Sequence, residues 1–203
     1  LIGLGAVATL VPWNAMAAIK PKVVGPASSA VKLTPPPAGR PTVAPTPKTK
    51  TWAQPPRRIK LYNTHTLETL EVAYFHHGKY DPVALKKLNY FLRDHYANKV
   101  ATIDPRLFDL LFAVQNSLQT REAFRVISGY RSPATNAALR AESDGVALHS
   151  YHMKGMAVDV ALADRRVGAI SKCARDMNCG GVGTYYGSGF VHLDVGPVRT
   201  WGA

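Results

Sequence analysis

The stretch Ser150-Tyr151-His152-Met153-Lys154-Gly155-Met156-Ala157-Val158-Asp159-Val160-Ala161-Leu162 decides the fold of this chain. From Met156 onward its large apolar side chains recur at every second position, which is the period of a strand with one buried face. The opposite face carries Asp159 between two alanines. The pattern therefore predicts a strand over about residues 156–162, whose open face is a floor with one carboxylate on it.

A second strand is predicted over residues 190–196, Phe-Val-His-Leu-Asp-Val-Gly, where the same alternation recurs. Its core face consists of two valines and a leucine, and His192 and Asp194 lie on the other face. If the two strands share a sheet with their core faces matched, both side chains lie on the same open face as Asp159. His152, which precedes a glycine turn, can fold back over that floor.

Two imidazoles and one carboxylate are a donor set of catalytic zinc sites, and they leave the fourth position open. With the charge of the ion and one carboxylate, the site keeps a net positive charge, which favours the oxyanion of an attacked amide. Each histidine alone is more often an ordinary surface or hydrogen-bonded residue. The three residues together, at positions opposite to core side chains, predict one Zn2+ per chain, held by His152, Asp159 and His192.

The same segment carries a resemblance to a known family. From Ser150 to Asp159 it reads Ser-x-His-x-x-Gly-x-Ala-x-Asp, and a strand with a histidine follows. This pattern resembles the zinc motif of the D-alanyl-D-alanine metallopeptidase superfamily, which also includes lysostaphin-type enzymes and the Hedgehog signalling domain. Residues 128–132, Ser-Gly-Tyr-Arg-Ser, resemble its Gly-Tyr-Arg-Ser element. Residues 189–196 and 199–201 are most similar to its murein endopeptidase K branch.

The resemblance, which covers about residues 58–203, implies that His152, Asp159 and His192 are the metal ligands. It also implies that Arg131 faces the scissile group or a substrate carboxylate. A guanidinium beside the metal would stabilise a tetrahedral oxyanion. An ordinary surface ion pair is the alternative role for this arginine.

The general base does not transfer from the family. Several branches place Glu or Asp three residues before the last histidine, and this chain has Gly189 there. Asp194, two residues past His192 on the same face, is the catalytic candidate. It could activate water, or it could orient a ligand imidazole from behind, and both roles stay open. His149 is a weaker candidate, which we expect in a loop or at the rim of the site.

The predicted function is that of a zinc metallopeptidase, a hydrolase that cuts an amide in the stem peptides of peptidoglycan, at the cross-link between stems. An exposed linker suits a wall enzyme that must reach a fixed polymer. One alternative is a carboxypeptidase that trims a terminal D-alanine. The other is a non-catalytic, zinc-stabilised wall-binding module, which the Hedgehog relatives and the missing upstream acid keep open.

Further elements are predicted around the two strands. They are a hairpin of Ile59–Tyr62 and Leu70–Tyr74, a strand at about 125–130, and helices at about 82–98, 105–119, 133–143 and 164–177. The first two helices carry proline near their starts, and Asp104 is the expected N-cap of the second. This order predicts an α+β domain with a small, largely antiparallel sheet, helices packed on one face and the zinc site on the open face.

The charge of the chain is unevenly distributed. Of the formal net charge of +12, nine units belong to residues 1–67, which contain no Asp or Glu. A basic chain favours an anionic partner, but zinc-finger spacing, a basic recognition helix and an aromatic RNA-binding motif are all missing, so nucleic acid is not expected. The charge of the tail either keeps it solvated and extended or attracts the chain to an anionic envelope surface.

The front of the chain is typical of an exported protein. Residues 1–18 are apolar and end in Ala15-Met16-Ala17, as in a secretory signal peptide whose positive n-region is missing. A retained membrane anchor is the alternative, although a proline and an asparagine interrupt the run. Residues 19–57 are rich in proline, which predicts an extended linker. We expect a folded domain over residues 58–203, located in the periplasm or cell envelope, without stable membrane insertion after signal cleavage.

Cys173 and Cys179 are the two cysteines of the chain. In an exported protein, a pair so close in sequence favours a disulfide, and two free thiols are the alternative. Two cysteines with this spacing are a poor zinc site, so the metal prediction rests on the histidines and Asp159.

Overall fold

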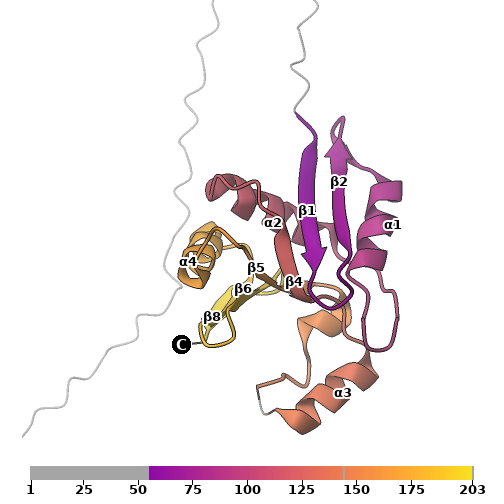
Figure 1. Cartoon of the computed structure of the whole chain (residues 1–203), viewed down its shortest axis with the longest axis vertical. Coiled ribbons are helices and arrows are strands. Elements are labelled where there is room, and N and C mark those ends of the chain that lie inside the picture. Colours follow the sequence, from indigo (N-terminus) through magenta and orange to yellow (C-terminus); the bar gives the residue numbers. More distant parts are fainter. Residues whose placement is uncertain (1–54, 144, 203) are drawn as a thin grey trace, which may run out of the picture. The chain divides into compact units, whose positions relative to one another are not determined.

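The computed structural model describes residues 55–143 and 145–202, which form one sheet with helices around it (Figure 1). In order across the sheet, the strands are β3 (Lys79–Tyr80), β2 (Thr69–His76), β1 (Arg57–Asn63), β4 (Phe124–Ser128), β5 (Ala157–Ala161), β7 (Phe190–Asp194), β6 (Gly181–Tyr185) and β8 (Arg199–Trp201). The helices are α1 (Pro82–Phe91), α2 (Pro105–Ser117), α3 (Pro133–Glu142), α4 (Val167–Met177) and the short 3-10 helix η1 (Tyr151–Lys154). The predicted signal peptide and all but the last three residues of the predicted linker lie outside the described residues.

The predicted α+β class is confirmed, but the sheet is larger than expected because it has eight strands. Five of its neighbouring pairs are antiparallel, and the pairs β1–β4 and β6–β8 are parallel. The sequence did not predict β3, β6 or β8. β6 reads Gly-Val-Gly-Thr-Tyr, and glycine at alternate positions removes the pattern by which a strand is recognised.

The helices begin where their sequence signals predict. The carboxylates of Asp81 and Asp104 accept hydrogen bonds from backbone N–H groups in the first turns of α1 and α2, and proline follows each cap. α1 nevertheless ends at Phe91, well before the predicted end at about residue 98. The reason is Asp94, which accepts hydrogen bonds from the backbone of Tyr96 and Ala97 and so turns the chain away from the helix axis.

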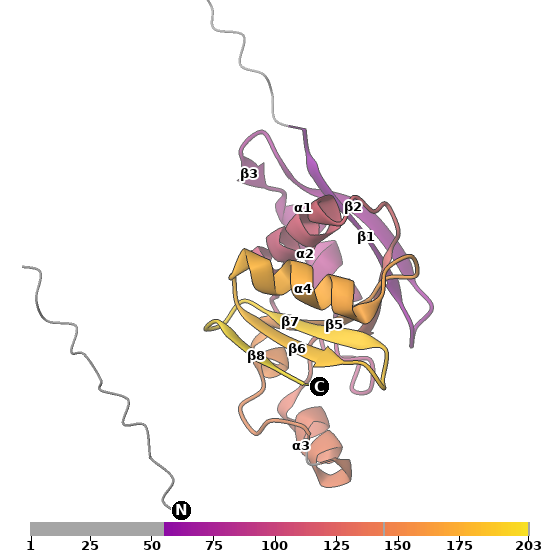
Figure 2. The same cartoon turned by 90° about the vertical axis from the view of Figure 1, so that its left-hand side faces the viewer.

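The core lies between the sheet and three helices. α1 contacts β2, α2 contacts β1, and α4 contacts β6 and β7. Figure 2 shows α2 and α4 on one side of the sheet and α3 on the other. Most helices therefore cover one face of the sheet, as predicted. The exception is α3, which lies on the opposite side and leaves part of that face open. Within residues 55–143 and 145–202, no helix has the length and apolar character needed to cross a membrane.

The predicted disulfide is wrong, because both cysteines are free. Cys173 lies within α4, half-buried, with its sulfur 4.0 Å from the carbonyl oxygen of Val114 in α2. Cys179 follows the left-handed residue Asn178 that ends the helix, and its exposed thiol contacts the carbonyl oxygen of Met177. The end of the helix thus separates two residues that are close in sequence.

Candidate metal centre

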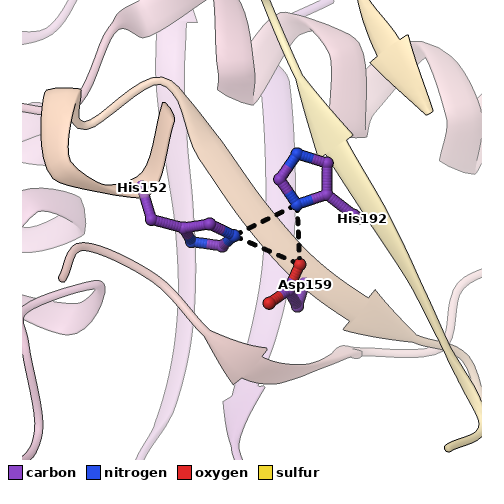
Figure 3. A group of neighbouring side chains, drawn as sticks. All are labelled: His152, Asp159 and His192. Atoms are coloured by element: carbon purple, nitrogen blue, oxygen red, sulfur yellow. Dashed lines mark hydrogen bonds and ion pairs between the residues drawn. The ribbon is translucent and has the colours of Figure 1, made fainter. Parts of the chain in front are cut away.

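Three buried side chains from different elements point toward one another on the open face of the sheet (Figure 3). Oδ1 of Asp159 in β5 lies 2.9 Å from Nδ1 of His192 in β7 and 3.2 Å from Nε2 of His152 in η1. The two ring nitrogens are 3.1 Å apart. The structure thus brings together the three residues that the sequence predicts as ligands. One ligand atom from each of the three side chains lies within 4.8 Å of the other two, which is close enough for the group to hold a metal ion.

Strand pairing places two of the three residues. Asp159 and His192 are direct partners in the antiparallel pair of β5 and β7, so their side chains leave the same face of the sheet. Their neighbours Val158, Val160 and Leu193 turn to the other face and are fully buried in the core. The alternation predicted from the sequence is therefore the arrangement that aims a carboxylate and an imidazole at one point.

The short helix η1 places the third residue. The Oγ atom of Ser150 accepts a hydrogen bond from the backbone N–H of His152, which caps the turn. Gly155 ends it in a left-handed conformation, with φ of 64°. A side chain at this position would also collide with the carbonyl group of Thr102. Both the backbone conformation and the lack of space therefore require glycine. The turn brings His152 back over β5.

The outer nitrogen of each imidazole already has an acceptor. Nδ1 of His152 lies 2.7 Å from the carbonyl oxygen of Gly129, and Nε2 of His192 lies 3.0 Å from Oδ2 of Asp194. An N–H group at each of these positions leaves the lone pairs of the inner nitrogens directed at the site. Carbonyl and carboxylate partners of this kind are the usual support of metal-binding histidines.

The three pKa values respond to burial and to the close contacts. Burial lowers the pKa of His152 below its usual value, although Asp159 acts in the opposite direction. Burial acts on His192 in the same way, but the carboxylates of Asp159 and Asp194 outweigh it and raise its pKa. Burial alone would raise the pKa of Asp159, yet the two imidazoles hold it well below its usual range. The carboxylate of Asp159 is therefore ionised, and a proton would compete with a bound metal ion for His192.

Asp194 is fully buried behind His192, and its oxygens have many partners. Oδ2 accepts from Nε2 of His192 and, at 2.6 Å, from Nη2 of Arg199. Oδ1 accepts from the backbone N–H groups of Gly181 and Gly196 and from Nη1 of Arg199. Burial raises the pKa of Asp194, but His192 and Arg199 outweigh this effect and lower it. The carboxylate lies beside the outer nitrogen of the ring, on the side away from Asp159.

Arg131 lies on the other side of the group. Its Nη2 donates to Oδ2 of Asp159 at 2.6 Å, and its Nε donates to Oγ of Ser128 at 2.8 Å. An irregularity in the pairing of β4 with β5, between Val126 and Ser128, places Ser128 opposite Asp159. Asp159 thus directs one oxygen to the two imidazoles and the other to a guanidinium that is mostly buried.

Comparison with known proteins shows the family of the chain. The family described as peptidoglycan L,D-endopeptidase MepK matches residues 51–201. This chain belongs to the MepK family. The peptidoglycan L,D-endopeptidase MepK of Escherichia coli strain K12 is 47% identical over 160 residues, which cover 78% of this chain and 88% of the relative. The probable MepK of Haemophilus influenzae is 42% identical over 147 residues, which cover 72% and 79% of the two chains.

The crystal structure of the L-Ala D-Glu endopeptidase ChiX of Serratia marcescens is among the solved structures that this chain matches. It covers 47% of this chain and 68% of its own, with a TM-score of 0.32 and 19% identity. The assignment to the MepK family does not rest on it.

In this member of the MepK family, the three side chains lie in an open cleft of about 550 Å³. Its walls include Arg131, His149, Tyr185, Phe190, Arg199 and Trp201. The rings of Tyr185 and Phe190 stack at a centroid distance of 4.6 Å, and the indole N–H of Trp201 donates to the hydroxyl of Tyr185. The cleft thus combines the charged and polar side chains of the donor set with aromatic side chains along one wall.

The roles of Arg199 and Trp201 in this MepK-family site did not follow from the sequence, which only marked them as part of the resemblance. β8 has three residues, too few for a period of two to be recognised. The contact between Arg199 and the buried carboxylate depends on a parallel pairing with β6 that no local pattern predicts.

His149 is exposed and lines the cleft, as expected for a residue at the rim. Gly189, at the position of the acid in other branches, lies in the turn between β6 and β7 with φ of 76°.

Proposed function

We propose that this chain is a zinc-dependent peptidoglycan endopeptidase that hydrolyses the peptide cross-links between stems, with His152, Asp159 and His192 as the zinc ligands. One observation carries the proposal. Three donor atoms converge in a cleft, and each imidazole is already held from behind by an acceptor on its outer nitrogen. Histidines that bind a metal are usually held in this way, because the partner of the outer nitrogen fixes the ring and directs the inner nitrogen at the ion.

The distances within the donor set support zinc. Two ligand atoms at the usual distances from a tetrahedral zinc ion are about 3.3 Å apart. The three separations here are 2.9, 3.1 and 3.2 Å. Two nitrogens and one oxygen also match the ligand types of zinc hydrolases, in which the fourth position stays open.

Arg131 is proposed to act on the reacting amide. A zinc ion held by His152, Asp159 and His192 would supply Lewis acidity toward the scissile carbonyl. The guanidinium of Arg131 is fixed by Ser128 and Asp159, so it needs little reorganisation to stabilise negative charge on the carbonyl oxygen. Mutation of one such preorganised donor typically lowers turnover by about 10²–10³-fold.

Asp194 is proposed to orient His192 and not to act as the general base. Its two oxygens already accept from His192, from Arg199 and from two backbone N–H groups. It contacts the outer nitrogen of the ring, so the imidazole separates it from the donor set. A base must be within hydrogen-bond reach of the proton that it removes.

The substrate class and location follow from the family. The relatives at 47% and 42% identity are named as peptidoglycan L,D-endopeptidases, the second as a probable one. We therefore propose an amide of the stem peptides as the bond that is cut. Peptidoglycan lies outside the cytoplasm, so the proposal also places this chain in the periplasm or cell envelope, in agreement with the signal-like sequence of residues 1–18.

Mass spectrometry of muropeptides, before and after incubation of sacculi with the purified full chain, tests the function. Cross-linked dimers should fall and monomers rise, with glycan strands uncut. Release of free D-alanine while dimers persist would instead indicate a carboxypeptidase. Unchanged muropeptides from a chain that binds zinc would indicate a binding module.

Substitution of the ligands tests the metal site. The wild-type chain should hold about one zinc ion, and His152→Ala and His192→Ala should each lose both zinc and activity. His77→Ala, at an exposed histidine in the turn between β2 and β3, is the matched control and should keep both. Full zinc occupancy in both ligand variants would exclude this site.

A further inference from the structure

β6 has glycine at two positions that face the open side of the sheet. Val182 and Thr184 point to the opposite side, where Val182 is part of the core and the hydroxyl of Thr184 lies 2.6 Å from that of Ser171 in α4. Gly181 and Gly183 must therefore face the metal-site side, because side chains alternate along a strand. Glycine in a strand interior weakens the strand, so two of them call for a reason.

The reason lies in the next strand of the sheet. Arg199 and Trp201 of β8 pair with Gly181 and Gly183 of β6. A Cβ atom at Gly183 would lie 2.6 Å from Cε2 and 2.7 Å from Nε1 of the indole of Trp201, distances that packed atoms do not tolerate. At Gly181 a Cβ would meet the carboxylate of Asp194 and the guanidinium of Arg199. The space left by the two glycines is thus occupied by the side chains of β8.

The indole of Trp201 is fixed in this space. Its Nε1–H donates to the hydroxyl of Tyr185 at 2.9 Å. The guanidinium of Arg199 lies 4.9 Å from the ring centroid and is itself held by Asp194. A half-buried tryptophan with a satisfied N–H group and a cation on its face has little freedom to move.

The same indole packs against His192, which is the direct partner of Gly183 in the pairing of β6 with β7. The two ring centroids are 5.1 Å apart, with their planes at 52°. A single hydrogen bond from Nε2 to Asp194 leaves an imidazole free to tilt about that bond. Contact with the indole removes this tilt, and Nδ1 keeps one direction, toward Asp159 and His152.

We propose that Trp201 is a positioning residue for His192, and that Gly183 is there to admit its indole against the imidazole. The inference rests on the zinc site proposed above, and it adds a contact through which the terminal strand of the sheet sets the affinity for the metal. Trp201 acts through His192 and does not touch the ion.

Zinc affinity of the full chain, measured by competition with a chelator and without substrate, tests the inference. Gly183→Ala displaces the indole and Trp201→Ala removes it, so each should lower zinc affinity by about 10–100-fold, as expected on loss of a group that orients a ligand. Trp201→Phe keeps a ring in place and should recover much of the affinity. Gly187→Ala is the matched control and should leave zinc affinity unchanged, since a Cβ at this exposed position would meet no atom within 4 Å.

Cobalt substitution gives a second readout. The visible absorption of Co2+ in this site depends on ligand geometry, so its bands should change in Gly183→Ala and Trp201→Ala and stay the same in Gly187→Ala. A general loss of stability does not produce this pattern in a protein that still melts cooperatively. If Gly183→Ala does not fold, Trp201→Ala decides alone, because it truncates a half-exposed residue of the edge strand β8.

Zinc affinity and cobalt spectra equal to wild type in Trp201→Ala would overturn the inference, even if the chain cleaves peptidoglycan. A wild-type chain that binds zinc but leaves muropeptides unchanged would overturn the endopeptidase proposal alone. The effect of Trp201 on zinc affinity would stand in that case. A wild-type chain without measurable zinc affinity would overturn both.

Discussion

His192 lies between two carboxylates: Oδ1 of Asp159 is 2.9 Å from its Nδ1, and Oδ2 of Asp194 is 3.0 Å from its Nε2. One carboxylate lies on the side of the donor set and the other on the opposite side of the ring. The sequence placed Asp194 on the same face as His192 but did not decide whether it acts as the general base or orients the imidazole of His192. Because Asp194 contacts the outer nitrogen of the ring, its position favours the orienting role.

Asp194→Asn tests this role. Asparagine keeps the shape of the side chain but lacks the charge that binds Arg199 and His192. We expect zinc affinity to fall by about 10–100-fold and turnover to recover toward wild type when zinc is added in excess. A variant with normal zinc affinity and turnover lower by about a thousandfold would instead identify Asp194 as the base. The first outcome leaves His149 or the substrate as the proton acceptor.

Arg131→Lys tests the guanidinium beside Asp159. Lysine keeps the positive charge, but it cannot donate to Ser128 and Asp159 from a rigid fork. We expect turnover on muropeptide dimers to fall by about 10²–10³-fold while zinc stays bound. Arg140→Lys, at an exposed position in the last turn of α3, is the control and should behave as wild type. Equal turnover in both variants would return Arg131 to the role of an ordinary ion pair.

Asp94 should make the stability of the fold depend on pH in acid. Its Oδ2 accepts from the backbone N–H of Ser132, next to Arg131. Burial raises its pKa, but hydrogen bonds with Thr135, Ser132 and Ala97 outweigh this effect and lower the pKa to about 2. The pKa is below that of the unfolded chain, about 3.9, so the stabilisation is complete above that pH and is lost as pH falls toward about 2.

Urea unfolding of wild type and Asp94→Asn at a series of pH values measures this contribution. The difference in free energy of unfolding should be about 2 kcal/mol at neutral pH and should shrink below about pH 4. Asp176→Asn, in an exposed pair with Lys172, is the control and should show a difference near zero throughout. A difference for Asp94→Asn that does not change with pH would contradict the assignment.

The cysteines should react as two thiols. Intact-mass measurement after alkylation without reductant should show two additions per folded chain, the first at exposed Cys179 and the second, more slowly, at half-buried Cys173. A chain that gains no additions until it is reduced would restore the disulfide.

The parts of the fold that could be predicted are those with a local physical signal. Alternation placed Asp159 and His192 opposite to core residues, and aspartate followed by proline located the starts of α1 and α2. The donor set follows from the same alternation, because two strands with matched core faces must also match their open faces. His152 needed one more signal, the glycine that ends η1.

The parts that could not be predicted depend on contacts between distant segments. β6 lacks a strand pattern because its glycines make room for side chains of β8. The cysteine spacing indicated a bond, but the helix end at Asn178 directs the two thiols to different surroundings. The end of α1 depends on Asp94, whose side chain competes for backbone N–H groups that a longer helix would have used.

The direct pairing of Asp159 with His192 makes the proposed metal site a check on how the sheet has assembled. Slippage of β7 by one residue would bring Val191 or Leu193 opposite Asp159 and turn the imidazole into the apolar core. Such a chain would lose its core packing and one of its three donor side chains in the same step. If zinc binds as proposed, its uptake during refolding reports on the alignment of β5 with β7, and a preparation can be judged by its metal content before any substrate is added.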